Sequence, residues 1–261
     1  MSEPIQVERH ESGIAHVIFN RPGRLNAFDF AMGAAYRDVC VELTSDATTK
    51  AIVLRGEGPA FCAGGDVVAM AGAGVRGTDV TRGAHVIHEG IAALVESEVP
   101  VVAAVHGAVA GGGVGLMLAA DYVVAASTVM VAGKYADVGL TPDLGVSTLL
   151  TRAVGERRAL AMLVAGVQAD ATKALEWGLV QEVVPDPVMR AHEVAQVWAT
   201  SATAALGGAK RLVRAAPERS FRESLDQEAR RIGQAYDTAD ARARIAAFTE
   251  RATRASAGRE G

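Results

Sequence analysis

The stretch Phe61-Cys62-Ala63-Gly64-Gly65-Asp66 and a second glycine cluster, Gly111-Gly112-Gly113, decide the fold of this chain. Each cluster follows a short apolar run rich in β-branched residues, and each precedes an apolar stretch that can form a helix. Both clusters are therefore expected to join a strand to a helix. Such a joint exposes unpaired backbone N–H groups, and glycine lets a ligand approach the main chain closely. Two of these turns facing one cavity could bind a developing oxyanion.

Four further blocks of sequence complete a recognisable pattern. They are Asn20-Arg21-Pro22 with Leu25-Asn26-Ala27, Gly139-Leu140-Thr141-Pro142-Asp143 with residues 152–155, residues 174–180, and residues 247–251. Together with the two glycine turns, these blocks resemble the motifs of the crotonase superfamily, the enoyl-CoA hydratases and isomerases. Any one motif is a weak signal, but six in order along nearly the whole chain are a specific one.

The composition excludes several classes of protein. The chain has 261 residues, of which 50% are hydrophobic and 21% charged, as in a soluble globular protein. Its net charge of −4 provides no basic surface for nucleic acid, and Lys210, Arg211 and Arg214 are interpreted as the solvated face of a helix. Cys40 and Cys62 are too few for a disulfide framework or a zinc site, which favours a cytoplasmic location. No apolar run is long enough to span a membrane, so no membrane partner is expected.

The order of strand-like and helical segments predicts an α/β fold. Strands are expected at residues 14–19, 51–55 and 121–126, and helices at 29–43, 82–98 and 114–120. From residue 51 onward, strand, glycine turn and helix alternate, which is typical of mostly parallel strands. Beyond residue 185 the strand signals disappear, and helices are expected at 188–200, 206–215, 221–236 and 239–254.

The resemblance makes this architecture more specific. It implies a crotonase spiral of ββα repeats over residues 1–187, carrying the CoA-binding and catalytic groups. It also implies a helical region over residues 188–261 through which chains assemble into a homotrimer or a hexamer, a dimer of trimers. The substrate would be an acyl-CoA thioester, so coenzyme A would be part of the substrate and no separate cofactor is expected.

Residues 69–83 are expected to form a mobile loop. Residues 72–77 spell G-x-G-x-x-G, but no strand ends before them and no apolar helix follows directly, so a dinucleotide site is not expected. The resemblance implies that this loop borders the acyl pocket. His85 and His88 follow on one helix face. Without a third ligand beside them they are interpreted as a solvated or pocket-lining pair, and no metal site is expected.

The resemblance also implies an oxyanion hole. The backbone N–H groups of Ala63 and Gly112 would bind the thioester carbonyl oxygen and stabilise an enolate. Hydratases of the family carry two catalytic glutamates, and the matching positions here are Gly115 and Tyr135. Hydration by a pair of carboxylates is therefore not supported.

Asp143 is the carboxylate left near the proposed site. It matches the functional aspartate of several isomerases of the superfamily, including ring-epoxide isomerases of phenylacetyl-CoA catabolism. An aspartate before residues 144–154 could instead be a helix N-cap. One carboxylate that removes a proton and returns it two carbons along suffices for double-bond isomerisation. Two alternatives remain open: another reaction of the family with an unidentified base, and a catalytically silent acyl-CoA-binding homologue.

The remaining expected contacts concern substrate and coenzyme A. The resemblance implies that Arg24, Leu25 and Ala27 lie at the CoA end. It also implies that Phe248 and Arg251 lie near the nucleotide, where a neighbouring subunit could supply them. The further candidate substrate contacts are Gly64, Gly65, Asp66 and Tyr135. For Asp66 and Asp121 a structural role, as helix cap or turn closure, is the favoured interpretation.

Overall fold

Apolar runs rich in β-branched residues form a central sheet. The structure is a computed structural model that describes residues 3–71 and 74–257. Its main sheet has the strand order β1-β2-β3-β4-β6-β9. The strands are β1 Ile5–Arg9, β2 Ile14–Phe19, β3 Ala51–Gly56, β4 Val101–Val105, β6 Tyr122–Ala125 and β9 Glu182–Val183. β1 is antiparallel to β2 and the other neighbouring pairs are parallel, which confirms the predicted α/β class.

A second, smaller sheet carries the second glycine turn. It consists of β5 Ala108–Ala110, β7 Met130–Ala132 and β8 Ala169–Asp170. The helices before residue 180 are α1 Phe30–Ser45, α2 Val67–Met70, α3 Gly77–Glu96, α4 Gly112–Leu118, α5 Val146–Val154, α6 Glu156–Leu163 and α7 Ala171–Glu176. The later helices are α8 Pro187–Thr200, α9 Thr203–Ala215, α10 Phe221–Tyr236 and α11 Ala239–Ala257. The four predicted C-terminal helices are thus present.

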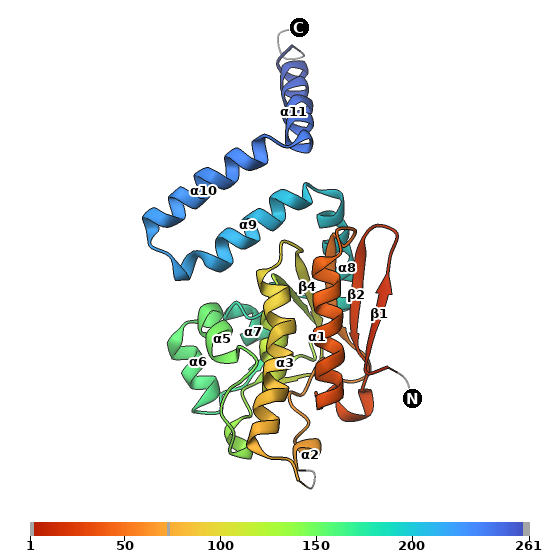
Figure 1. Ribbon diagram of the computed structural model, residues 1–261, viewed down its shortest axis with the longest axis vertical. Coiled ribbons are helices and arrows are strands. Elements are labelled where there is room, and N and C mark those ends of the chain that lie inside the picture. The colour runs from red at the N-terminus through yellow and green to blue at the C-terminus, as the bar shows by residue number, and fades with distance from the viewer. Residues whose placement is uncertain (1–2, 72–73, 258–261) are drawn as a thin grey trace.

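The sheet is covered on both faces. On one face α1 and α3 lie side by side, over an aromatic cluster in which Phe19 contacts Phe61 with ring centroids 5.1 Å apart (Figure 1). On the other face α8 packs against apolar residues of β2, β3, β4 and β6. Its buried residues Ala191, Ala195 and Ala199 recur every four positions, and their small side chains let the helix approach the sheet closely. α8 therefore shares the core of the sheet, although the predicted division at residue 187 groups it with the later helices.

The first strand and the start of α3 differ from the sequence-based expectation. β1 was not expected, because the short polar run at residues 5–9 lacks a clear apolar signal; only Ile5 of this strand is fully buried. α3 begins at Gly77, inside the expected loop 69–83, because Asp79 accepts a hydrogen bond from the Arg76 N–H at 3.0 Å and closes the first turn. Gly72 and Ala73, the first two positions of the G-x-G-x-x-G string, lie outside the described residues.

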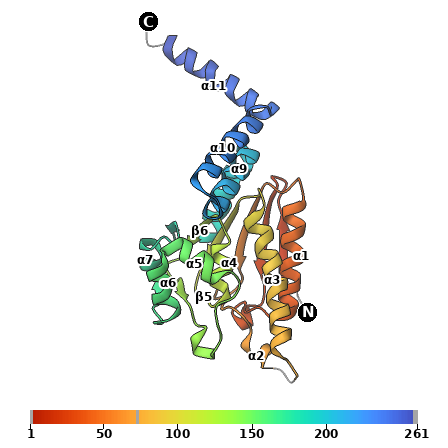
Figure 2. The same ribbon diagram turned by 60° about the vertical axis from the view of Figure 1, so that its left-hand side comes forward.

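The last two helices extend away from the body. Figures 1 and 2 show α10 and α11 projecting from the end of the molecule opposite α2. They expose large apolar side chains: Ile232 is 73% exposed and Phe248 is 67% exposed. Among the described residues, no helix has the length and apolar character needed to cross a membrane.

Candidate active site

The two glycine turns lie side by side. Cys62 donates its N–H to the Ala108 carbonyl at 3.2 Å and accepts from the Ala110 N–H at 3.0 Å, which joins the first turn to β5. A Cβ at Gly113 would overlap the Cys62 carbonyl, so the close approach requires glycine at that position. The sequence-based expectation that both turns face one site is consistent with this arrangement.

The N–H of Ala63 already has a partner, contrary to its predicted role as an oxyanion donor. It donates to the Leu25 carbonyl at 3.0 Å, which ties the first glycine turn to the segment that precedes α1. A donor satisfied within the protein would have to break this bond before it could bind a ligand. Motif matching could not detect this, because the bond joins residues 38 positions apart.

The N–H of Gly65 points away from that segment. On either side of it, the Gly64 carbonyl accepts from the Phe28 N–H at 2.8 Å and the Asp66 N–H donates to the Phe28 carbonyl at 2.9 Å. Since successive peptide groups of an extended segment point to opposite sides, the Gly65 N–H is directed away from Phe28. A methyl group on Gly64 would lie 3.2 Å from the Gly112 nitrogen, so the second turn is adjacent. Gly112 begins α4, where an N–H has no partner within the helix.

Asp143 lies beside the second turn. A methyl group placed on Gly112 would lie 3.6 Å from Asp143 Oδ1, and the same oxygen accepts a hydrogen bond from the Tyr135 hydroxyl at 2.7 Å. The alternative that Asp143 caps the next helix is wrong: the N-cap of α5 is Gly145, and no side chain caps it. The Asp143 carboxylate is thus turned toward Tyr135 and the glycine turn.

Tyr135 is a hydrogen-bond donor to Asp143. Its side chain is buried, and burial, reinforced by the charge of Asp143 and the hydrogen bond to it, raises the pKa of the Tyr135 hydroxyl well above its usual value. The phenol therefore keeps its proton and orients the carboxylate. Tyr135 therefore supplies a hydrogen bond to the site and no carboxylate.

His88 positions the segment that carries Asp143. The Leu144 N–H donates to His88 Nε2 at 3.1 Å, so this nitrogen is unprotonated and the neutral ring carries its hydrogen on Nδ1. Leu144 has a φ of 49°, a left-handed conformation that is uncommon for leucine. The contact across 56 residues helps to hold this turn. The helical spacing of His85 and His88 suggested a pocket-lining pair, but gave no sign of this bond.

Gly115 leaves no room for a glutamate. A Cβ at this position would overlap the Leu144 carbonyl oxygen and would lie 3.0 Å from its carbon. The turn that places Asp143 at the site therefore occupies the space that a side chain at residue 115 would need. The lack of space for a side chain at residue 115 and the position of Asp143 thus follow from one local geometry.

A narrow cavity of about 30 Å³ lies next to Asp143. Its wall includes apolar side chains from α2, α3 and the turn after residue 143, namely Met70, Val80, Ile87 and Leu144. Of the segment expected to border a pocket, Ala69, Met70, Val80 and Gly83 line this cavity. Three aspartates, Asp29, Asp66 and Asp143, also line this cavity.

The segment expected to contact coenzyme A is a strained, exposed turn. Leu25 and Asn26 have φ values of 51° and 56°, and buried Asn26 holds the turn by accepting from the Arg21 N–H at 2.8 Å and donating to the Ala60 carbonyl at 2.8 Å. Arg24 and Leu25 are exposed, whereas Ala27 is buried. Leu25 and Arg24 are thus available to a ligand at the surface.

Asp66 has the structural role. Its Oδ1 accepts from the Ala69 N–H at 3.1 Å and caps α2, and its Oδ2 lies 3.0 Å from Arg21. Asp29 pairs with the same guanidinium at 3.0 Å. Because both oxygens of Asp66 have partners, the predicted substrate contact through its carboxylate is not supported.

Phe248 and Arg251 lie on α11, away from Asp143 within one chain. Figure 1 shows α11 at one end of the molecule and α2, which borders the cavity, at the other. Phe248 is exposed and Arg251 donates to the Ala247 carbonyl within its own helix at 3.1 Å. Within one chain these two residues are therefore not brought together with the cavity.

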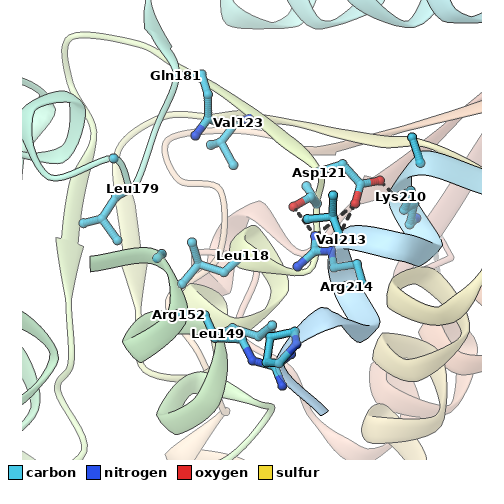
Figure 3. Close-up of a pocket in the computed structure, with 15 residues that line it drawn as sticks. Leu118, Asp121, Val123, Leu149, Arg152, Leu179, Gln181, Lys210, Val213 and Arg214 are labelled. Carbon is cyan, nitrogen blue, oxygen red and sulfur yellow. Dashed lines mark hydrogen bonds and ion pairs between the residues drawn. The ribbon is translucent and has the colours of Figure 1, made fainter. Parts of the chain in front are cut away.

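A larger cavity, of about 620 Å³, is separate from this site. Figure 3 shows Asp121 between Lys210 and Arg214, to which it is joined at 3.0 Å in each case. Lys210 is buried and also donates to the Leu94 and Val99 carbonyls, both at 2.7 Å. The prediction that this basic group is a solvated face is therefore wrong, because its charges hold α9 to the body. Asp121 is structural, as expected.

Comparisons with known proteins show the family of the chain. A family model for enoyl-CoA hydratase/isomerase matches residues 9–256. The 1,2-epoxyphenylacetyl-CoA isomerase of Escherichia coli (strain K12) is 33% identical over 245 residues, covering 91% of this chain and 92% of that protein. The 4-chlorobenzoyl coenzyme A dehalogenase-2 of Arthrobacter sp. is 30% identical, covering 97% and 93%.

A solved structure shares the whole fold. The crystal structure of enoyl-CoA hydratase from Mycobacterium smegmatis superposes with a TM-score of 0.90 at 27% identity, covering 96% of this chain and 97% of that chain. These relatives bear the names of three different reactions on acyl-CoA compounds. The paired glycine turns, the match over nearly the full length and the shared fold lead to one conclusion: this chain belongs to the enoyl-CoA hydratase/isomerase family, with the crotonase fold.

Proposed function

We propose that this protein isomerises a double bond of an acyl-CoA thioester, with Asp143 as the base. Asp143 removes a proton from the carbon next to the thioester carbonyl, and an enolate forms. The same carboxyl group then returns the proton two carbons along, so the substrate and product have the same composition. The Gly65 and Gly112 N–H groups bind the enolate oxygen, whose charge is larger in the transition state than in the substrate.

The observation that carries this proposal is which of the carboxylates around the cavity are paired with a cation. Asp29 and Asp66 are both paired with Arg21. Asp143 has no cationic partner among the described residues; it accepts a hydrogen bond from neutral Tyr135 beside Gly112. It is therefore the lining carboxylate best placed to take up a proton.

Two features favour isomerisation over hydration. The Leu144 carbonyl leaves no space for a side chain at Gly115. Tyr135 carries a phenol that stays protonated. Neither position therefore provides the second acid–base group that hydration needs. The relative named 1,2-epoxyphenylacetyl-CoA isomerase is in line with this choice. The relative named as a dehalogenase shows that other reactions occur in the family, so the products must be identified.

The test compares Asp143→Asn with a matched control, Asp137→Asn. Asp137 is an exposed aspartate of the same segment that pairs with Lys134 at 2.8 Å. With a β,γ-unsaturated acyl-CoA, we expect the wild type and Asp137→Asn to yield the α,β-isomer. We expect Asp143→Asn to be slower by about 100-fold or more, as for loss of a general base. A 3-hydroxyacyl product from the wild type, or full activity of Asp143→Asn, would contradict the proposal.

We also propose that the active form is a trimer or a dimer of trimers. The exposed apolar residues of α10 and α11 need a partner surface, and a closed symmetric assembly would provide one. In such an assembly Phe248 and Arg251 of one chain could reach the CoA end of another, where Arg24 and Leu25 are exposed.

A further inference from the structure

Three histidines from distant parts of the chain meet outside the active site. His10 lies in the turn after β1, His16 on β2 and His192 on α8. Their ring centroids are 5.0, 5.0 and 5.2 Å apart. When one nitrogen atom is taken from each ring, the three nitrogens all lie within 4.8 Å of one another. We call these residues the histidine cluster.

His16 is unusual for its position. It lies on the face of β2 that α8 covers, in line with buried Ile14 and Ile18, and is only 5% exposed. Its Nε2 is 3.0 Å from His192 Nδ1, but its Nδ1 has no hydrogen-bond partner. Buried polar atoms are normally paired, so a buried imidazole with one unpaired nitrogen needs an explanation.

We infer that the histidine cluster binds a divalent transition-metal ion such as Zn²⁺. Imidazole nitrogens suit zinc, cobalt, nickel and copper, and three of them with one open position form a common tetrahedral zinc set. Zn–N distances of 2.0–2.1 Å place two ligand nitrogens about 3.3 Å apart in a tetrahedron. His16 Nε2 and His192 Nδ1 are already 3.0 Å apart. A metal ion can take the place of the hydrogen between them if the two nitrogens move slightly further apart.

His10 completes the set with little reorganisation. It is exposed, and its backbone is fixed by a turn in which it donates to the Ile14 carbonyl and accepts from the Gly13 N–H, both at 2.9 Å. Its ring centroid already lies 5.0 Å from those of His16 and His192. Since His10 is at the surface, solvent can supply the fourth ligand.

The charged neighbours of the cluster are compatible with a cation. Glu8 lies opposite His16 in the β1–β2 register. Arg55 on β3 is the nearby positive group, and it is paired with both Glu8 and Glu57, so its charge is offset. A bound metal would link the β1–β2 hairpin to α8, two elements that are 176 residues apart at the His16–His192 contact.

The test is a metal titration of untagged, chelator-treated protein near neutral pH. Co²⁺ reports tetrahedral coordination through its visible absorption, and Zn²⁺ is then added in competition while calorimetry gives stoichiometry and affinity. We expect one ion per chain. We expect at least about 10-fold weaker binding in His10→Gln and in His192→Gln, and no change in His85→Gln, which removes a histidine outside the cluster.

His16 is left intact because its replacement could disturb the core, and His10→Gln alters only an exposed side chain. Unfolding midpoints without metal would confirm that the variants fold. The wild-type midpoint should rise with Zn²⁺, and the His10→Gln midpoint should rise less at the same Zn²⁺ concentration. Dissociation constants weaker than about 100 µM, or equal affinities for the wild type and a His10→Gln/His192→Gln double variant, would overturn the inference.

Discussion

At the scale of single residues, the site depends on the pairing of Tyr135 with Asp143. The 2.7 Å hydrogen bond joins a buried phenol, whose raised pKa keeps it protonated, to the carboxylate that is proposed to move the proton. The donor thereby fixes the carboxylate rotamer next to Gly112. A positioning donor of this kind should affect the rate more than the fold.

Replacing Tyr135 by phenylalanine tests this role. Tyr135→Phe keeps the ring and removes only the donor to Asp143, and hydrogen bonds to charged groups contribute roughly 1.5–3 kcal/mol. We therefore expect kcat to fall by about 10- to 100-fold with KM nearly unchanged. The control is Tyr122→Phe, which removes a hydroxyl bonded to Glu182 at 2.9 Å on the main sheet. Equal kcat values for the two variants would remove Tyr135 from the mechanism.

At the scale of elements, the α4 helix and the turn before α5 fit only if residue 115 has no side chain. The Leu144 carbonyl occupies the Cβ position of Gly115, and Leu144 is held in a left-handed conformation by its bond to His88. The turn that presents Asp143 and the helix that presents Gly112 are therefore built as one unit. This packing predicts how the site responds to a restored side chain.

Gly115→Ala should destabilise the protein by about 1–3 kcal/mol or more, since the added carbon forces α4 away from the turn. The matched control is Gly208→Ala on α9, where a Cβ would meet nothing within 4 Å. That variant should be neutral or slightly stabilising, because alanine favours a helix. Urea unfolding measures both. If Gly115→Ala were as stable as the wild type, the turn would not be rigid. A glutamate could then fit at residue 115, and Gly115→Glu would have to be assayed for hydratase activity.

The sequence predicted the elements better than it predicted their contacts. Strand and helix periodicity located the central strands, the glycine turns and the four C-terminal helices. Local patterns could not show that Ala63 donates to Leu25, that His88 holds Leu144, or that Lys210 is buried against Asp121. Each of these bonds joins residues far apart in the chain, so the fold must be known before the partner is.

The prediction for Asp143 was limited in the same way. Its place before a helix made an N-cap plausible, but the N-cap of α5 is Gly145. The two left-handed residues Leu144 and Gly145 separate Asp143 from Val146, where the helix begins. The position of a catalytic aspartate could be taken from the family resemblance alone. Its neighbours, Tyr135 and Gly112, could be joined to it only in the structure.

At the scale of the whole molecule, α10 and α11 predict assembly. Figure 2 shows them extending from the body, and their exposed residues include Phe221, Ile232, Tyr236 and Phe248. Sedimentation at micromolar concentration should give a trimer or a hexamer. Ile232→Glu should shift the distribution toward monomer, whereas Val164→Glu, at a 76% exposed position on the C-terminal side of α6, should not. A wild-type monomer would contradict both the assembly and a CoA site shared between chains.

The central claim is that Asp143 transfers a proton next to a thioester carbonyl. Its most direct test is exchange of that proton in deuterium oxide, followed by NMR on a bound acyl-CoA, since exchange reports enolate formation whatever the product. The account predicts exchange by the wild type and Asp137→Asn, and a rate lower by about 100-fold or more in Asp143→Asn. Exchange at the wild-type rate in Asp143→Asn would contradict it, and so would the absence of exchange in a wild-type protein that binds the thioester.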